Sequence, residues 1–130
     1  PAGAYSLLTT AFDFQLFLQA IASGKGLAAT THKLLLQDEV PVKRIGDSTA
    51  MHISWSLGIG KMRNELGTAF WHWGDNGNFK SFFLFYPFSG LGLVCMTNSE
   101  NGLQLMQPLF EHYFGTASWW LVPWLEKAFR

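Results

Sequence analysis

Apolar residues near the start of the chain recur with helical spacing. They fall at positions i, i+3, i+4 and i+7, and they are Phe14, Phe17, Leu18 and Ile21. Thr10 is a suitable N-cap for this helix, with Asp13 three residues later in the position of a capping box. Gly24 and Gly26 are expected to end the helix, because glycine readily adopts the left-handed conformation found at helix C-termini.

A second, shorter helix is expected soon after these glycines. The pattern predicts that it begins near Thr30 or Thr31 and continues through Leu35. Pro41 bounds it, because proline cannot lie inside a helix without removing a hydrogen bond. We interpret the following stretch, residues 42–52, as a loop.

The middle of the chain changes to the spacing of β-strands. Trp55, Leu57 and Ile59 alternate with small polar residues, which is the period-two pattern of a strand. The segment Phe79–Tyr86 is apolar on nearly both faces, so we expect it to be central and covered on both sides. Short connections predict antiparallel pairing in chain order. The four predicted strands are residues 55–60, 69–73, 79–86 and 91–97.

Helical spacing returns over residues 102–114, and Gly115 is expected to end this last long helix. The tail, residues 119–125, is rich in tryptophan and irregular around Pro123. We expect it to dock on the domain; a membrane-surface segment is the less favoured alternative, because sparse Lys and Arg give it no basic amphipathic face. Together these elements predict an α+β fold, an antiparallel sheet with packed helices.

Composition and charge narrow the functional classes. With 130 residues, 48% hydrophobic and 14% charged, the chain is long enough for one domain and is not of the disordered type. Lys plus Arg equal Asp plus Glu in number, which argues against nucleic-acid binding. No apolar run reaches the roughly 18 residues that span a bilayer. Cys95 is the only cysteine, so no internal disulfide can form, and we expect a buried, inert thiol.

The segment between the second and third predicted strands carries the most informative chemistry. It contains the titratable side chain of His72, followed by Gly74, Asp75 and Asn76. Glycine lets another molecule approach the backbone closely, and exposed N–H groups can face an anion. Taken alone, a strand, a polar turn with glycine and another strand is more often an ordinary hairpin.

The order of four segments along the chain strengthens the functional interpretation of this turn. Residues 1–14 contain small residues followed by the start of a helix. The second segment has the pattern W-x-L-G-x-G, in Trp55-Ser56-Leu57-Gly58-Ile59-Gly60. His72-Trp73-Gly74 follows, and residues 91–102 contain G-L-V-C-M-T-N-S-E-N-G. In this order the segments resemble the serine β-lactamase and penicillin-binding-protein family, specifically class C β-lactamases, DD-peptidases and related esterases. His72-Trp73-Gly74 stands where that family has its third motif, Lys-Thr-Gly or His-x-Gly.

The resemblance also implies what this chain lacks. In the family the nucleophile lies in a Ser-x-x-Lys motif, and a second motif supplies Tyr-x-Asn. Neither motif occurs in this sequence, and in the family both precede the matching region. We therefore expect residues 1–130 to be a single C-terminal segment of a partial serine β-lactamase/transpeptidase-like fold, with the N-terminal part that carries the nucleophile absent.

The resemblance implies roles for five residues. As catalytic groups, the backbone N–H of Asp75 is one donor of an oxyanion hole, and His72 takes the place of the motif's Lys. Gly74 keeps the strand edge open, and Trp73, Gly74 and Asn76 are expected to contact the substrate. Histidine is mostly neutral at pH 7 and Trp73 lacks a hydroxyl, so both departures favour an esterase or peptidase over an efficient β-lactamase.

Other interpretations stay open. His72 could be a structural histidine between Trp71 and Trp73, which we expect on opposite strand faces. A metal site from His72 and Asp75 lacks a third ligand at meaningful spacing, and the resemblance implies no cofactor. The whole chain could be a non-catalytic, penicillin-binding-like scaffold or binding module.

The resemblance also sets expectations about surroundings. The expected partner is a small-molecule or peptide ester or amide substrate, with no nucleic acid and no membrane span. Family members are often exported, so a periplasmic or secreted location is expected. The isolated chain is expected to self-associate, because the family fold covers its sheet with segments that are absent here.

Overall fold

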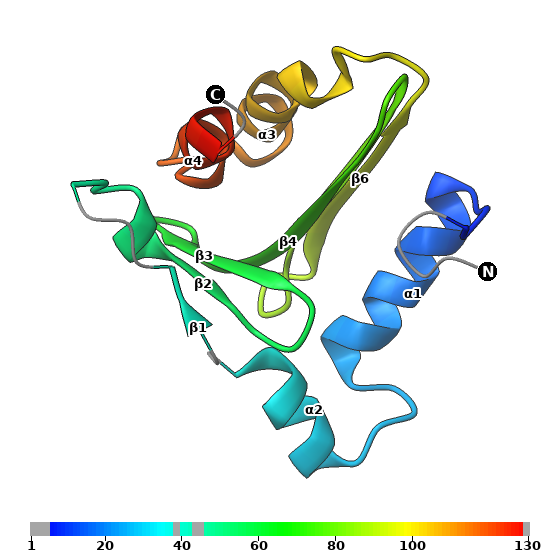
Figure 1. Ribbon diagram of the computed structural model, residues 1–130. Helices are drawn as coiled ribbons and strands as arrows, with labels where there is room; N and C mark the ends of the chain where they lie inside the picture. Colours follow the sequence, from blue (N-terminus) through cyan, green and yellow to red (C-terminus); the bar gives the residue numbers. More distant parts are fainter. Residues whose placement is uncertain (1–5, 38–39, 43–45, 129–130) are drawn as a thin grey trace.

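The computed structural model describes residues 6–37, 40–42 and 46–128 (Figure 1). Within these residues the strands form one antiparallel sheet of six, in the order β1-β2-β3-β4-β5-β6. The elements in chain order are α1 (Ala11–Ser23), α2 (Ala29–Leu36), β1 (Val40–Pro41), η1 (Ala50–His52), β2 (Ile53–Trp55), β3 (Gly60–Asn64), β4 (Gly67–Asn76), β5 (Phe79–Tyr86), β6 (Leu91–Thr97), η2 (Gly102–Leu105), α3 (Met106–Phe114) and α4 (Leu121–Ala128). The expected α+β class, an antiparallel sheet with packed helices, is confirmed.

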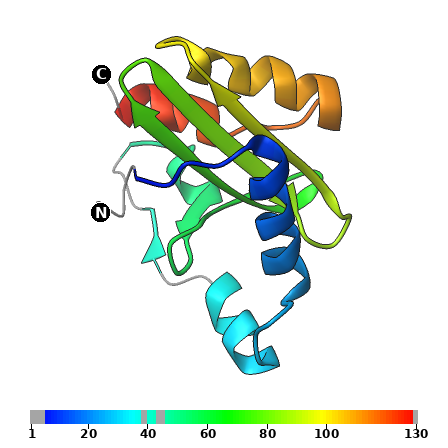
Figure 2. The same ribbon diagram turned by 90° about the vertical axis from the view of Figure 1, so that its right-hand side faces the viewer.

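Helices cover both faces of the sheet. Figures 1 and 2 show α3 and α4 on one face and α1 on the other, with α2 projecting beyond the sheet. The larger core lies under α3 and α4 and contains Ile53, Met62, Ala69, Trp71, Phe82, Leu84, Tyr86, Met106, Phe110, Trp119, Leu121 and Leu125. The smaller core lies under α1 and contains Leu18, Ile59, Phe70 and Phe85.

Helix α1 begins and ends as the sequence predicts. The Thr10 side chain accepts a hydrogen bond from the backbone N–H of Asp13 at 3.1 Å, which satisfies an N–H that has no partner inside the helix. Gly24 follows the helix in the left-handed conformation, with φ of 71°. The apolar stripe is narrower than expected, because Leu18 is buried whereas Phe17 is 55% exposed.

The second helix is also confirmed, but the loop after it is only partly so. Nε2 of His32 lies 2.7 Å from the carbonyl oxygen of Ile21, which connects α2 to α1. The expected loop, residues 42–52, contains a 3-10 turn at Ala50–His52, and residues 43–45 lie outside the described residues. Strand β1 has two residues, too few for a period-two pattern.

The predicted strand 55–60 is wrong: this segment is a hairpin. Trp55 and Gly60 are cross-strand partners of β2 and β3, and the backbone N–H of Ser56 donates to the carbonyl of Ile59 at 2.9 Å. Gly58 supplies the positive φ, 79°, that the turn requires. Leu57 is therefore 55% exposed at the tip, whereas a continuous strand would have placed it on one face with Trp55 and Ile59.

The other three predicted strands are confirmed, and one is longer than expected. β5 and β6 have the predicted bounds, and β4 covers Gly67–Asn76 in place of 69–73. The polar residues after Trp73 belong to the strand because Gly74, Asp75 and Asn76 pair with β5. The turn itself is Gly77-Asn78, where Gly77 has φ of 60°.

The expectation that Trp71 and Trp73 point to opposite faces is wrong. Residues two apart in a strand share a face. The two indole rings stack with centroids 5.7 Å apart, on the side of α3 and α4. His72 is the residue that points to the other face.

The C-terminal region docks on the domain as expected, but its tail is helical. Residues 102–114 form η2 and α3, and α4 follows, with Trp119, Leu121 and Leu125 buried in the larger core. Pro123 is the third residue of α4, where its missing N–H removes no helical hydrogen bond.

Two further expectations are settled in part. Cys95 is half-buried at the edge of the larger core, and burial raises the pKa of its thiol, which disfavours the reactive thiolate. No helix within the described residues is long and apolar enough to cross a membrane.

Candidate functional site

The five candidate residues lie together on the last half of β4, where the strand extends beyond its neighbour β3. In the described part of the chain, β3 pairs with β4 only from Gly67 to Trp71. From His72 to Asn76 the pairing continues with β5 alone. One edge of β4 is therefore without a described strand at this level, and this stretch is called the β4 edge below.

The direction of the backbone N–H and C=O groups along the β4 edge follows from the hydrogen-bond pattern between β4 and β5. In an antiparallel pair, successive residues direct their N–H and C=O groups alternately to the two sides. Asn76 and Phe79 flank a two-residue turn, so they exchange hydrogen bonds with each other, and Gly74 bonds to β5 in the same way. The N–H of Asp75 therefore faces away from β5, toward the side where β3 is missing.

His72 lies at this edge with a defined tautomer. Its Nδ1 is 2.7 Å from the carbonyl oxygen of Trp73, and because a carbonyl only accepts, Nδ1 must carry the hydrogen. Nε2 of the neutral ring is then an acceptor. No group in the part of the chain that the structure describes bonds to Nε2, so it is open to a hydroxyl or water.

Aromatic rings hold the imidazole of His72 from several sides. The ring of Trp73 stacks on it with centroids 5.4 Å apart, and Trp55 meets it edge-on at 5.6 Å. On the α1 face its cross-strand partner Phe83 lies 6.4 Å away. His72 is half-buried, so these rings fix its orientation while leaving part of it accessible.

The position of Trp55 depends on a glycine in the strand between it and β4. A Cβ at Gly60 would lie 2.6 Å from the ring of Trp71, so no other residue leaves room for this ring. Across Gly60 the rings of Trp55 and Trp71 meet with centroids 5.3 Å apart. Trp124 of α4 then packs against Trp73 at 6.1 Å.

The carboxylate of Asp75 takes no part in the surroundings of His72. Asp75 lies on the α3 face of β4, where it forms an ion pair with its cross-strand partner Lys80. Lys80 is buried. Only the backbone of Asp75 is therefore left for the β4 edge.

Gly74 and Asn76 share the α1 face with His72. A Cβ at Gly74 would lie 2.9 Å from the hydroxyl oxygen of Ser81, so glycine keeps this hydroxyl uncovered. Asn76 is exposed beside the turn. No cluster of three metal-ligating side chains exists within the described ranges 6–37, 40–42 and 46–128.

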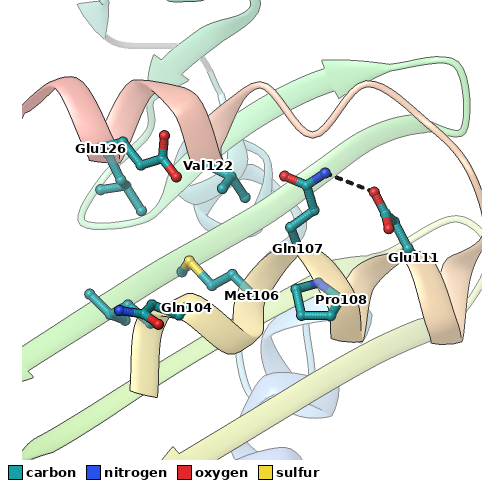
Figure 3. A pocket seen from close by; sticks show the side chains of 9 residues that line it. Gln104, Met106, Gln107, Pro108, Glu111, Val122 and Glu126 are labelled. Atoms are coloured by element: carbon teal, nitrogen blue, oxygen red, sulfur yellow. Dashed lines mark hydrogen bonds between the residues drawn. The ribbon is translucent and has the colours of Figure 1, made fainter. Parts of the chain in front are cut away.

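Two cavities in the described structure lie away from the β4 edge. One, of about 520 Å³, is a groove between the η2–α3 segment and α4 (Figure 3). The other, of about 360 Å³, lies between α1 and the end of the β5–β6 hairpin. None of the five candidate residues lines either cavity.

Three neighbours of the site could not be predicted from sequence patterns. The pattern places Trp55 in one predicted strand, and Lys80 and Phe83 in the predicted strand 79–86, without indicating a contact with the site. Their contacts follow from the hairpin register, in which His72 pairs with Phe83 and Asp75 with Lys80. Assigning the two-residue turn at Gly77-Asn78 is enough to derive both pairs.

Comparison with known proteins gives no identification: no family model matches the chain, and no curated protein matches it significantly.

Proposed function

We propose that this chain forms one wall of the active site of a serine hydrolase that acts by acyl transfer, as an esterase or peptidase of the β-lactamase-related type. The observation that carries the proposal is the direction of the Asp75 N–H, which faces the side of β4 where no described strand pairs with it, beside Gly74 and His72. The nucleophile would lie on a segment that precedes this region, as in the family that the sequence resembles.

The proposed reaction has two steps. The serine oxygen forms a bond to the carbonyl carbon of the ester or amide, and the alcohol or amine leaves with a proton. Water then cleaves the acyl-serine bond and releases the acid. In both steps the negative charge that develops on the carbonyl oxygen accepts a hydrogen bond from the Asp75 N–H, the interaction that stabilises the transition state.

His72 has a separate role in this proposal. With the hydrogen on Nδ1, its Nε2 accepts a hydrogen bond from the attacking or leaving hydroxyl and orients it. The rings of Trp55 and Trp73 exclude water from one side of the imidazole and favour substrates with an apolar acyl group.

Exposed apolar side chains on α1 support the proposal that this chain is part of a larger domain. Leu8 is 95% exposed, Phe12 67% and Phe17 55%, all on α1 or the segment before it. Exposed apolar side chains gathered on one element typically mark a surface that another segment or molecule covers. We propose that the segment carrying the nucleophile covers this side of the fold.

The test compares turnover with stability in the longer protein that contains the nucleophile. His72→Ala should lower turnover of a p-nitrophenyl ester per folded molecule by roughly 10²–10⁴-fold, the usual range for a general acid or base. His72→Asn, which keeps a polar group and similar size, is the matched control for packing. Unchanged turnover per folded molecule would contradict the role of His72.

The second candidate is a binding module without catalysis. The observation that favours it is that neither cavity includes a candidate residue, while His72 is packed among aromatic rings. This candidate predicts that His72→Ala lowers the melting temperature and ligand binding together, with no turnover in any variant.

A further inference from the structure

The groove between the η2–α3 segment and α4 has the dimensions of a ligand site. Its volume of about 520 Å³ lies within the range of roughly 300–1,000 Å³ that small-molecule sites occupy. Its apolar part is formed mainly by Leu103, Met106, Val122 and Leu125. Met106 and Leu125 are also members of the larger core, so the packing of the core fixes the floor of the groove.

Two carboxylates border this apolar floor (Figure 3). Glu111 of α3 accepts a hydrogen bond from Nε2 of Gln107 at 2.8 Å, and Glu126 lies on α4. Neither forms an ion pair with a cation among the described residues. The ammonium group of Lys127, next to Glu126 in the chain, is held by Asp47 at 2.9 Å.

We propose that this groove binds a small amphiphilic cation, a molecule with one ammonium group and a short apolar tail. The tail covers the apolar floor and removes it from water. The ammonium group lies beside the carboxylate of Glu126 at one end of the groove, and Glu111 at the other end adds to the negative potential that repels an anion with the same tail (Figure 3). Apolar contact supplies most of the affinity, because exposed ion pairs contribute little, and charge selects the ligand.

The four methionines of the chain allow a direct test. The protein is labelled with ¹³C at the methionine methyl groups and titrated with n-octylammonium chloride. Met106 lies in the groove, whereas Met51 and Met96 are exposed elsewhere and Met62 is fully buried under the sheet. We expect a saturable shift of the Met106 methyl resonance, with the other three resonances unchanged.

Charge selection is tested with octanoate, which has the same tail length, and with two variants. Glu126→Gln should weaken octylammonium binding about two- to fivefold, as expected for an exposed ion pair, and Glu111→Gln should weaken it less. Glu100→Gln, an exposed glutamate outside the groove, is the matched control and should leave binding unchanged. Octanoate should not shift the Met106 resonance at the same concentrations.

Three results would overturn the proposal. The first is equal binding of octylammonium and octanoate, and the second is equal shifts at Met51 or Met96. The third is a shift of the Met106 resonance on raising the protein concentration alone, which would mean that a second copy of the chain occupies the groove.

Discussion

Glu65, in the turn between β3 and β4, holds Ser118 with both of its carboxylate oxygens. The backbone N–H of Ser118 donates to Oε2 at 2.8 Å and its hydroxyl donates to Oε1 at 2.6 Å. These hydrogen bonds lower the pKa of Glu65 from 4.5 to about 2. Asp47 is similar, since hydrogen bonds from Thr49 and then Lys127 lower its pKa from 3.8 to about 2. Both carboxylates thus attach the C-terminal region to the preceding structure.

The first prediction is a loss of stability in acid. Because the folded pKa values of Glu65 and Asp47 lie below their ordinary values, their contribution is present above about pH 4.5 and is lost as the pH falls toward about 2. The urea midpoint, measured stepwise from pH 6 to pH 2, should fall within this window. Glu65→Gln should make the dependence shallower, whereas Glu100→Gln should not; equal curves for both variants would contradict the assignment.

The second prediction concerns the glycine under Trp71. Gly60→Ala places a Cβ against the indole ring, and overpacking of this kind costs about 1–3 kcal/mol in the free energy of unfolding. Gly74→Ala is the matched control in the neighbouring strand, where the obstacle is the hydroxyl of Ser81, which can rotate away. Chemical denaturation should therefore show the larger loss for Gly60→Ala. The reverse order would mean that Trp71 does not require this close approach.

The third prediction is that residues 1–130 alone self-associate. The apolar side chains of Leu8, Phe12 and Phe17 are exposed on α1 or just before it, and association would remove them from water. Sedimentation velocity should show a concentration-dependent increase in mass. The triple variant Leu8→Gln, Phe12→Gln and Phe17→Gln should shift the protein toward monomer, whereas Met51→Gln, on η1, should not. A clean monomer at high concentration for the unchanged chain would contradict this.

The fourth prediction is that residues 1–130 alone carry no reactive serine. The chain has no Ser-x-x-Lys motif, and a serine needs an adjacent base to act as a nucleophile. A fluorophosphonate or penicillin probe should therefore leave the folded chain unlabelled, as judged by intact mass. Labelling of Ser81, which lies beside Gly74, would place the nucleophile within this chain and refute the division of roles proposed here.

The elements that the sequence predicts well are those whose signals are local. The Thr10 cap, the strand Phe79–Tyr86 and the strand Leu91–Thr97 depend on neighbours within a few residues, and the structure has them at the predicted positions. The prediction of one strand over residues 55–60 is wrong because the alternation of Trp55, Leu57 and Ile59 is compatible with both a strand and a hairpin. Only the positive φ of Gly58 distinguishes the two, and a glycine in the sequence does not reveal its φ.

The candidate site was predictable in position but not in geometry. The sequence places His72 and Asp75 near one another, yet their side chains face opposite sides of β4. The contact of Trp55 with His72 joins β2 to β4 over the intervening glycine, and no periodicity in the sequence encodes such a contact.

The central claim is that the backbone N–H of Asp75 stabilises the oxyanion, and a pair of variants in the longer protein tests it most directly. Asp75→Pro removes the N–H at a strand edge, where proline is tolerated because no ladder hydrogen bond is lost. Asp75→Ala keeps the N–H and removes only the carboxylate that pairs with Lys80.

Turnover of a p-nitrophenyl ester, expressed per folded molecule, is the quantity to measure. We expect Asp75→Pro to lower it by about 10²–10³-fold relative to Asp75→Ala, the usual loss for one oxyanion-hole donor. Equal turnover in the two variants would contradict the claim.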